Sequence, residues 1–382
     1  MKIKLNKKIA VIAAVNIVCL GGAAGFYLKG QSEARSQDYN YAAERWGTEY
    51  TQISCFIPEK SGFSVDMIGA VRTQLLNTLQ TVSISAEEGR KLCPDAYSAP
   101  LGNADVKSSI GGYSDAEITV VGGDFFLIHN FTLLDGAFFS DNDIMQDGTV
   151  IDESLAWALY GSSDVAGMDI TINGVKLYIS GVIADPQSKA EKYCAGAIPR
   201  AYISYSGAYG ISQPGEPYTG SGGYMGDGGD IAGSADVSST FKTVTCYECI
   251  MPDPVEGYAY SAMKDYLSGL AEDAETVCNT DRFLPLKRLK ALKNLRKLAV
   301  RNSSAVFPYW ENASRLVEFD LSFTYRRVLW CMIIPALTLV RVIVKLFIIG
   351  RKKLRSAIDF ILRRKDEIIN NQRRKKYNAA GG

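Results

Sequence analysis

The fold of this protein is decided by residues 120–186, which read VVGGDFFLIHNFTLLDGAFFSDNDIMQDGTVIDESLAWALYGSSDVAGMDITINGVKLYISGVIADP. Asn173-Gly174 is a strong signal for a two-residue hairpin turn. A short helix is expected over 155–160, ended by Gly161. Short strands are expected at 116–121, 149–152, 169–172 and 176–183. The stretch therefore predicts a mostly β section with hairpins.

Strand and helix signals also flank this section. Apolar residues between 65 and 79 recur at helical spacing, and the same holds between 258 and 271. Further strands are expected at 50–57, 81–85, 201–205 and 243–250. Two strand–helix units on either side of a β-rich section indicate an α+β fold.

Charge is strongly partitioned although the net charge is only +1. Residues 31–281 contain 13 Lys/Arg and 35 Asp/Glu, a balance of 13 − 35 = −22. The segment after Gly350 has 11 Lys/Arg against three acids, and four Lys with no acid precede Ile9. Basic ends around an acidic middle follow the positive-inside rule for a chain with both termini in the cytoplasm. The competing interpretation is a soluble protein with charged tails.

Two apolar runs are long enough to cross a bilayer, at 9–28 and 328–350. The first is also compatible with a signal peptide, although its apolar core is longer than usual for one. Gly21-x-x-x-Gly25 in this run could admit a neighbouring helix. In the second run we expect Pro335 to kink the helix.

Three further segments carry distinct compositions. A Gly-, Ser- and Tyr-rich loop is expected at 206–234, as a lid or an insertion. Leucine recurs every three residues from Leu286 to Leu298 among Lys and Arg, which predicts a basic amphipathic helix. Its two expected partners are an anionic membrane surface and the acidic domain itself. Tyr309 and Trp310 suit a membrane interface.

Chemistry-bearing motifs are few, and we predict no catalytic, cofactor-binding or metal-binding residues. The single histidine, His129, lies among apolar residues and is expected to be a satisfied, partly buried residue, the alternative being a catalytic base. The acidic turn around Asp141 departs from the calcium-loop pattern. No Gly-Lys dipeptide occurs, so the chain lacks a P-loop. Cys246-x-x-Cys249 lies beside a strand, which favours structural disulfides to other cysteines over a redox pair. The six cysteines of the acidic block suffice for three disulfides.

The order of motifs in 120–186 resembles the extracytoplasmic core domain of MacB-like ABC-transporter permeases. The resemblance implies a membrane-anchored, two-lobed α+β core in which discontinuous segments either side of the β-rich section build one lobe. Family permeases usually have four membrane helices, whereas this chain has two apolar runs. The expected segments are a cytoplasmic N-terminus (1–8), a first transmembrane helix (9–28), the extracytoplasmic core (29–285, with a stalk at 31–49), a basic amphipathic stalk and juxtamembrane segment (286–327), a second transmembrane helix (328–350) and a basic cytoplasmic tail (351–382).

The resemblance also implies a function without enzymatic activity. We expect a permease-like, non-ATPase subunit of the cell membrane that couples a separate cytoplasmic ABC ATPase to export or envelope work. Its expected partners are the ATPase, other permease subunits or further copies of itself, and lipid, but not nucleic acid. The alternative is a membrane-anchored extracytoplasmic binding or sensor module, whose acidic domain captures a cationic peptide or an envelope protein.

Overall fold

The computed structural model describes residues 7–37, 45–46, 50–85, 91–208, 211, 241–294 and 303–380. The chain divides into two compact units. Gln31–Ser322 form one, called the core unit below, and Met1–Gly30 with Phe323–Gly382 form the other, called the helical unit. Most of the predicted Gly-rich loop, part of the predicted stalk and the end of the predicted basic helix lie outside the described residues.

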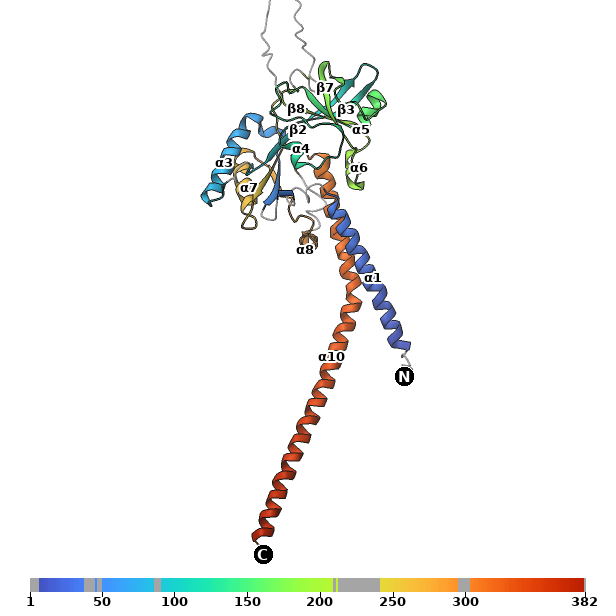
Figure 1. Ribbon diagram of the computed structural model, residues 1–382, viewed down its shortest axis with the longest axis vertical. Helices are drawn as coiled ribbons and strands as arrows, with labels where there is room; N and C mark the ends of the chain where they lie inside the picture. Colours follow the sequence, from blue (N-terminus) through green and yellow to red (C-terminus); the bar gives the residue numbers. More distant parts are fainter. Residues whose placement is uncertain are drawn as a thin grey trace, which may run out of the picture. The chain divides into compact units, whose positions relative to one another are not determined.

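The core unit is built on one ten-stranded mixed sheet (Figure 1). The strand order is β10-β1-β9-β2-β3-β8-β5-β7-β4, and β6 pairs with β2 and β7. Two neighbouring pairs, β3 with β8 and β5 with β7, are parallel, and the others are antiparallel. The strands are β1 (Tyr50–Phe56), β2 (Asp95–Lys107), β3 (Gly112–Gly123), β4 (Leu133–Gly136), β5 (Gly148–Asp152), β6 (Asp169–Ile172), β7 (Val175–Ile183), β8 (Arg200–Ser204), β9 (Cys246–Pro252) and β10 (Glu275–Cys278).

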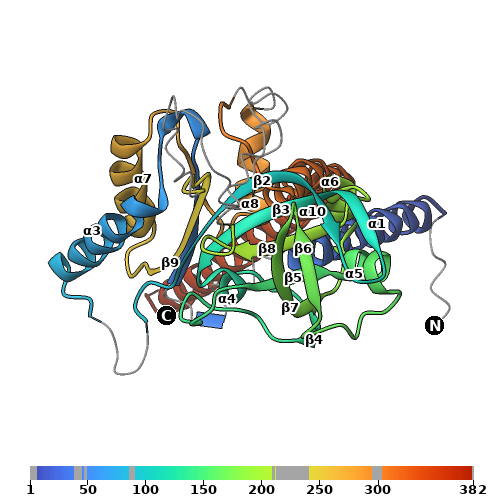
Figure 2. The same cartoon turned by 90° about the horizontal axis from the view of Figure 1, so that it is seen from above.

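Two hydrophobic cores divide this unit into two lobes. The first lobe packs α3 (Ile68–Thr81) and α7 (Tyr258–Leu270) side by side against β1 and β9 (Figure 2). Its core residues come from both ends of the core unit's sequence, since Ile53, Leu75 and Met263 all belong to it. The discontinuous lobe predicted from the family resemblance is therefore present, and the α+β class is confirmed.

The second lobe is formed by the β-rich middle of the chain, packed around α5 (Glu153–Tyr160). Asp152 caps α5 by accepting a hydrogen bond from Leu155 N, and Gly161 ends it with φ of 69°. Asn173 and Gly174 take φ of 43° and 88°, the left-handed values that a two-residue hairpin between β6 and β7 requires. The local signals in this stretch were thus sufficient for the turn and for the end of the helix at Gly161, whereas α5 begins at Glu153, two residues before the predicted start.

Several predicted elements differ from the observed ones. The strand predicted at 81–85 is wrong, because α3 runs to Thr81 and then ends in a turn in which Ile84 N donates to Leu79 O. The strand that follows α3 is instead the long β2. Its pairing register with β3 shifts between Pro100 and Gly102. The predicted basic helix begins with α8 (Pro285–Ala291) and a single turn at Leu292–Asn294. Also unpredicted were α4 (Phe125–Ile128), α6 (Lys189–Ala195), β4 and β10.

The helical unit contains parts of α1 (Lys7–Arg35) and α10 (Tyr309–Ala380). Both helices are long and apolar enough to cross a membrane, by length and composition. Within this unit Thr338 Oγ1 lies 3.2 Å from Asn16 Oδ1. A Cβ built on Gly30 would lie only 3.0 Å from the Tyr325 ring, so this close approach of the two helices favours glycine.

The glycine pair of α1 takes a different role from that expected, and the kink at Pro335 stays a prediction. Gly21 and Gly25 face open space within the described residues, and Gly22 instead approaches Cys331 Sγ at 3.6 Å. The α10 helix continues without interruption past Pro335, and Thr338 Oγ1 donates to Pro335 O at 2.8 Å.

Candidate functional site: the buried start of helix α10

The first turns of α10 are part of the core unit, not of its surface. Pro308 precedes the helix, and the residues buried in its first turns follow helical spacing. They are Trp310, Glu311, Ala313, Ser314, Val317, Glu318 and Leu321. Trp310 is only 6% exposed and packs in a hydrophobic cluster with Phe125 and Tyr202. The prediction that Trp310 lies at a membrane interface is therefore wrong, because the indole fills the base of the folded domain.

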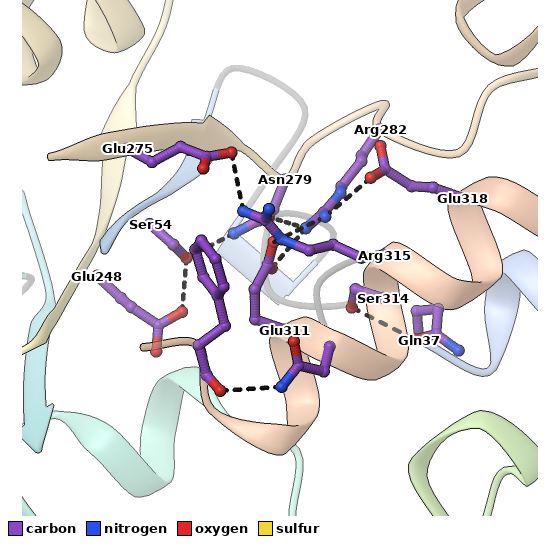
Figure 3. Close-up of polar contacts among 12 residues, drawn as sticks. Gln37, Ser54, Glu248, Glu275, Asn279, Arg282, Glu311, Ser314, Arg315 and Glu318 are labelled. Atoms are coloured by element: carbon purple, nitrogen blue, oxygen red, sulfur yellow. Dashed lines mark hydrogen bonds and ion pairs between the residues drawn. The ribbon is translucent and has the colours of Figure 1, made fainter. Parts of the chain in front are cut away.

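A buried ionic network fixes this helix start to the sheet (Figure 3). Arg282 binds Glu311 in a bidentate pair, with Nη1 at 2.8 Å from Oε2 and Nη2 at 2.9 Å from Oε1. Arg282 Nη2 also contacts Glu318 Oε2 at 3.1 Å. Burial alone lowers the pKa of Arg282, but Glu311 and Glu318 outweigh it and raise the pKa above the ordinary value. The guanidinium is therefore permanently charged inside the domain.

Two further arginines complete the network. Arg315 Nε donates to Glu311 at 2.5 Å, and its Nη2 contacts Glu275 at 2.9 Å, at the start of β10. Arg288, on α8, contacts Glu318 at 2.5 Å. Three arginines thus face three glutamates, so the charges balance within the cluster. Arg288, from the predicted basic helix, pairs with Glu318 of α10, which lies outside the acidic block 31–281.

The network continues into the sheet through buried polar side chains. Asn279 accepts from Arg282 and donates through Nδ2 to Ser54 Oγ at 2.7 Å. Ser54, on β1, donates to Glu248 Oε1 on β9 at 2.6 Å. The other oxygen of Glu248 lies 2.6 Å from His129 Nε2, just after α4. His129 is 1% exposed, so it is a satisfied histidine, as expected, but it is fully and not partly buried.

Aromatic contacts add a second set of links between the helix start and the second lobe. The Arg200 guanidinium, on β8, lies 4.7 Å from the centre of the Tyr309 ring. Tyr309 OH is 3.4 Å from Tyr202 OH. Trp310 packs at 5.0 Å from His129, ring centre to ring centre. The first turn of α10 is therefore held by both lobes of the core unit.

Two cavities flank the same turn. Tyr309 and Trp310 line a cavity of about 380 Å³ beside β2 and β8, and another of about 190 Å³ beside His129 and Asp185. Trp310 Nε1 is buried and has no hydrogen-bond partner in the described part of the chain. Both cavities are therefore lined in part by the first turn of α10.

The end of α1 meets the same region of the core unit. Gln37 follows the helix and is buried, and Ser314 Oγ lies 3.4 Å from Gln37 Oε1. Arg45 donates to Ile128 O at 2.7 Å, at the end of α4. The core unit is connected to the apolar helices by the segment after α1 and by the start of α10. Both of these connections thus contact the surroundings of Trp310.

Sequence reasoning missed this network, although one signal was present. Glu311, Arg315 and Glu318 are spaced i, i+4 and i+7, which places them on one face of a helix. Three charges on one face usually point to solvent, and only the fold shows that Arg282 and Arg288 meet them. Within the described residues no group of three or more His, Cys, Asp or Glu side chains is placed to hold a metal ion.

Comparisons with known proteins assign the chain to a family. The family model for the MacB-like periplasmic core domain matches residues 9–230, more than half of the chain. No curated protein matches the sequence. Among solved structures, the periplasmic region of MacB from Actinobacillus actinomycetemcomitans is 14% identical with a TM-score of 0.37, covering 66% of this chain and 94% of that one.

A second solved structure is the extracellular domain of the noncanonic ABC-type transporter YknZ from Gram-positive bacteria. It is 12% identical with a TM-score of 0.36, and the match covers 59% of this chain and 99% of that one. The assignment rests on the family model, whose match includes the stretch 120–186 from which the resemblance was first drawn. The chain belongs to the family of the MacB-like periplasmic core domain.

Proposed function

We propose that this protein is the permease-like, non-ATPase subunit of an ABC-type complex, and that it couples a separate cytoplasmic ATPase to work outside the membrane. In this proposal the chain crosses the membrane twice, at 9–28 and 328–350, and both termini are cytoplasmic. The core unit then lies outside, and the basic segment from 351 faces the ATPase. The basic ends and the acidic core support this orientation.

The observation that carries the proposal is the continuity of α10. One helix, Tyr309–Ala380, contains the second apolar run, and its first turns belong to the core unit. The Arg282–Glu311 pair supports a firm attachment, because leaving either charge buried without its partner costs about 3–5 kcal/mol. A displacement of the helix is therefore expected to move the sheet, not to pull out of it.

Two membrane helices do not enclose a transport pathway. We therefore expect the protein to act with further subunits, either copies of itself or other permease chains. The test is affinity capture of the tagged full chain from native membranes in mild detergent. Recovery of an ABC-type ATPase in near-equal amount supports the proposal, and recovery of the chain without any ATPase contradicts it.

The second candidate function is a membrane-anchored binding or sensor module. It is favoured by the excess of 22 negative charges over residues 31–281, which attracts cationic ligands. This function predicts salt-sensitive binding of a cationic peptide by the full chain without any ATPase. The same capture experiment separates the two functions, because only the first requires an ATPase partner.

A further inference from the structure

Two cysteines of the first lobe lie against each other at the junction of β2 and β9. Cys249 lies on β9 and is fully buried in the core of the first lobe. Cys93 lies two residues before β2, is half-buried, and packs against the same core. The spacing of the six cysteines does not select one of their possible connectivities.

The strand register places these two side chains on one face. Asp95 is opposite Cys249 in the β2–β9 pair, and Ile250 N donates to Pro94 O at 2.9 Å. Cys93 is two residues before Asp95, so its side chain is on the same side and diagonally across from Cys249. The two thiols are in hydrogen-bonding contact, which together with burial raises the pKa of Cys249.

The geometry separates Cys249 from its neighbour in the CxxC motif. Cys246 and Cys249 are three residues apart on β9, and successive side chains in a strand point to opposite faces. Cys246 accordingly packs beside Phe56 in a different cluster from Cys249. The two cysteines of this motif therefore cannot join to each other without disrupting the strand.

The other cysteines of the same sheet contact hydroxyl groups. Thr276 Oγ1 lies 3.6 Å from Cys55 Sγ, and Thr51 Oγ1 lies 3.4 Å from Cys278 Sγ. Cys194 is on α6, beside the larger of the two cavities at the start of α10. None of these contacts involves Cys249, whose thiol partner is Cys93.

We propose that Cys93 and Cys249 form a disulfide that joins the start of β2 to β9, with the disulfide of an extracytoplasmic thiol–disulfide oxidoreductase as the oxidant. The half-exposed Cys93 thiolate attacks the oxidant's disulfide, forming a mixed disulfide and releasing one thiolate. Cys249 then loses its proton and attacks the Cys93 sulfur, releasing the second thiolate. Two protein thiols are oxidised and one disulfide of the oxidant is reduced to two thiols.

The bond would reinforce a junction that polar contacts already hold. Asp95 accepts from Arg72 Nε at 2.8 Å and from Tyr247 OH at 3.1 Å, immediately beside the two cysteines. A covalent link at this point closes a loop of more than 150 residues in the unfolded chain. Loops of that length give disulfides their largest expected effect on the unfolded state. The inference rests on the extracytoplasmic location given under the proposed function.

The test uses the full chain, purified in detergent and incubated with oxidised glutathione, then alkylated and digested with trypsin without reduction. The expected product joins peptide 92–107, with Cys93, to peptide 243–264, and its mass is about 2 Da below the sum of the two free peptides. Cys246 is in the second peptide as well, so the decisive variant is Cys246→Ser, in which the link must persist. In Cys93→Ser, a change at a half-exposed position, the link must disappear.

Quantitative alkylation of Cys93 and Cys249 after oxidation, or loss of the link in Cys246→Ser, overturns the proposal. A second measurement traps thiols with acid and alkylating reagent in intact cells. The proposal requires the joined peptide there as well, and free thiols at both positions in cells contradict it. Its failure is distinguishable from failure of the proposed function, because ATPase capture does not depend on the state of these thiols.

Discussion

The substitution Glu311→Gln tests the buried network most sharply. Glu311 accepts hydrogen bonds from Arg282 at 2.8 and 2.9 Å and from Arg315 at 2.5 Å. Glutamine keeps the size of the side chain but removes the negative charge between the two guanidinium groups. Removing one partner of a buried ion pair costs about 3–5 kcal/mol, because the other charge stays buried. At roughly 2–4 °C per kcal/mol for a unit of this size, the apparent Tm should fall by about 6–20 °C.

The assay is thermal unfolding of the full chain in detergent, followed by tryptophan fluorescence. Trp310 packs in the cluster next to the network and reports its loss. The matched control is Lys176→Met, which removes a surface pair with Asp169 at 2.7 Å whose side chains are 70% and 67% exposed. Its Tm should equal that of the wild type, because exposed pairs contribute little.

A double substitution separates the ionic explanation from a simple packing defect. In Arg282→Met/Glu311→Gln, the pairs Arg315–Glu275 and Arg288–Glu318 remain, and the buried charges balance again. The double variant should therefore be more stable than Glu311→Gln alone. The reasoning is refuted if Glu311→Gln unfolds within about 2 °C of the wild type. It is also refuted if the stability lost by the double variant equals the sum of the losses measured for Glu311→Gln and for Arg282→Met alone.

Three further predictions concern the remainder of the chain. Burial raises the pKa of Asp152 from 3.8 to about 7, so the folded core binds a proton that the unfolded chain releases above pH 4. The free energy of unfolding should therefore fall as the pH rises from about 4 to 7, by up to about 4 kcal/mol relative to Asp152→Asn. Chemical denaturation of both proteins at each pH measures this difference. A similar dependence of the unfolding free energy on pH for the wild type and Asp152→Asn contradicts this. Gly136→Ala should destabilise the core unit by roughly 1–3 kcal/mol more than Gly167→Ala. Both positions have positive φ, but only at Gly136 would the new Cβ meet a backbone oxygen. Equal losses of unfolding free energy in denaturant titrations rule out this close approach. Gly30→Leu should lower the Tm of the full chain in detergent, while Gly25→Leu leaves it unchanged, because only Gly30 faces the Tyr325 ring. Equal effects of the two substitutions on the Tm would show that the helices do not pack at Gly30.

Local sequence signals predicted those elements whose causes are local. The hairpin at Asn173-Gly174 and the end of α5 at Gly161 depend on residues that accept positive φ, and both were found where predicted. Helical periodicity likewise located α3 and α7. The long strand β2 was missed because Pro100 interrupts its apolar alternation, and its length follows from pairing with β3, β6 and β9.

The candidate site depends on contacts that the sequence does not encode locally. Arg282 and Glu311 are 29 residues apart, and the bidentate contact between them appears only when β10 and the start of α10 are brought together. Trp310 was misplaced because an aromatic residue shortly before an apolar run has the same composition whether it lies in lipid headgroups or in a protein core. The family resemblance, by contrast, was carried by a short stretch with many local constraints, and it was confirmed.

The central claim is that movement of α10 reaches the core unit through its buried start, and Trp310 can report this directly. The measurement uses the full chain, with Trp46, Trp157 and Trp330 replaced by phenylalanine, reconstituted in liposomes with the ABC ATPase captured from native membranes. We predict that ATP with vanadate changes the emission of Trp310, and that Glu311→Gln, studied below its Tm, reduces this change although the ATPase, assayed without vanadate, still hydrolyses ATP. An active, bound ATPase whose cycle leaves the emission of Trp310 unchanged in the otherwise wild-type chain contradicts the claim.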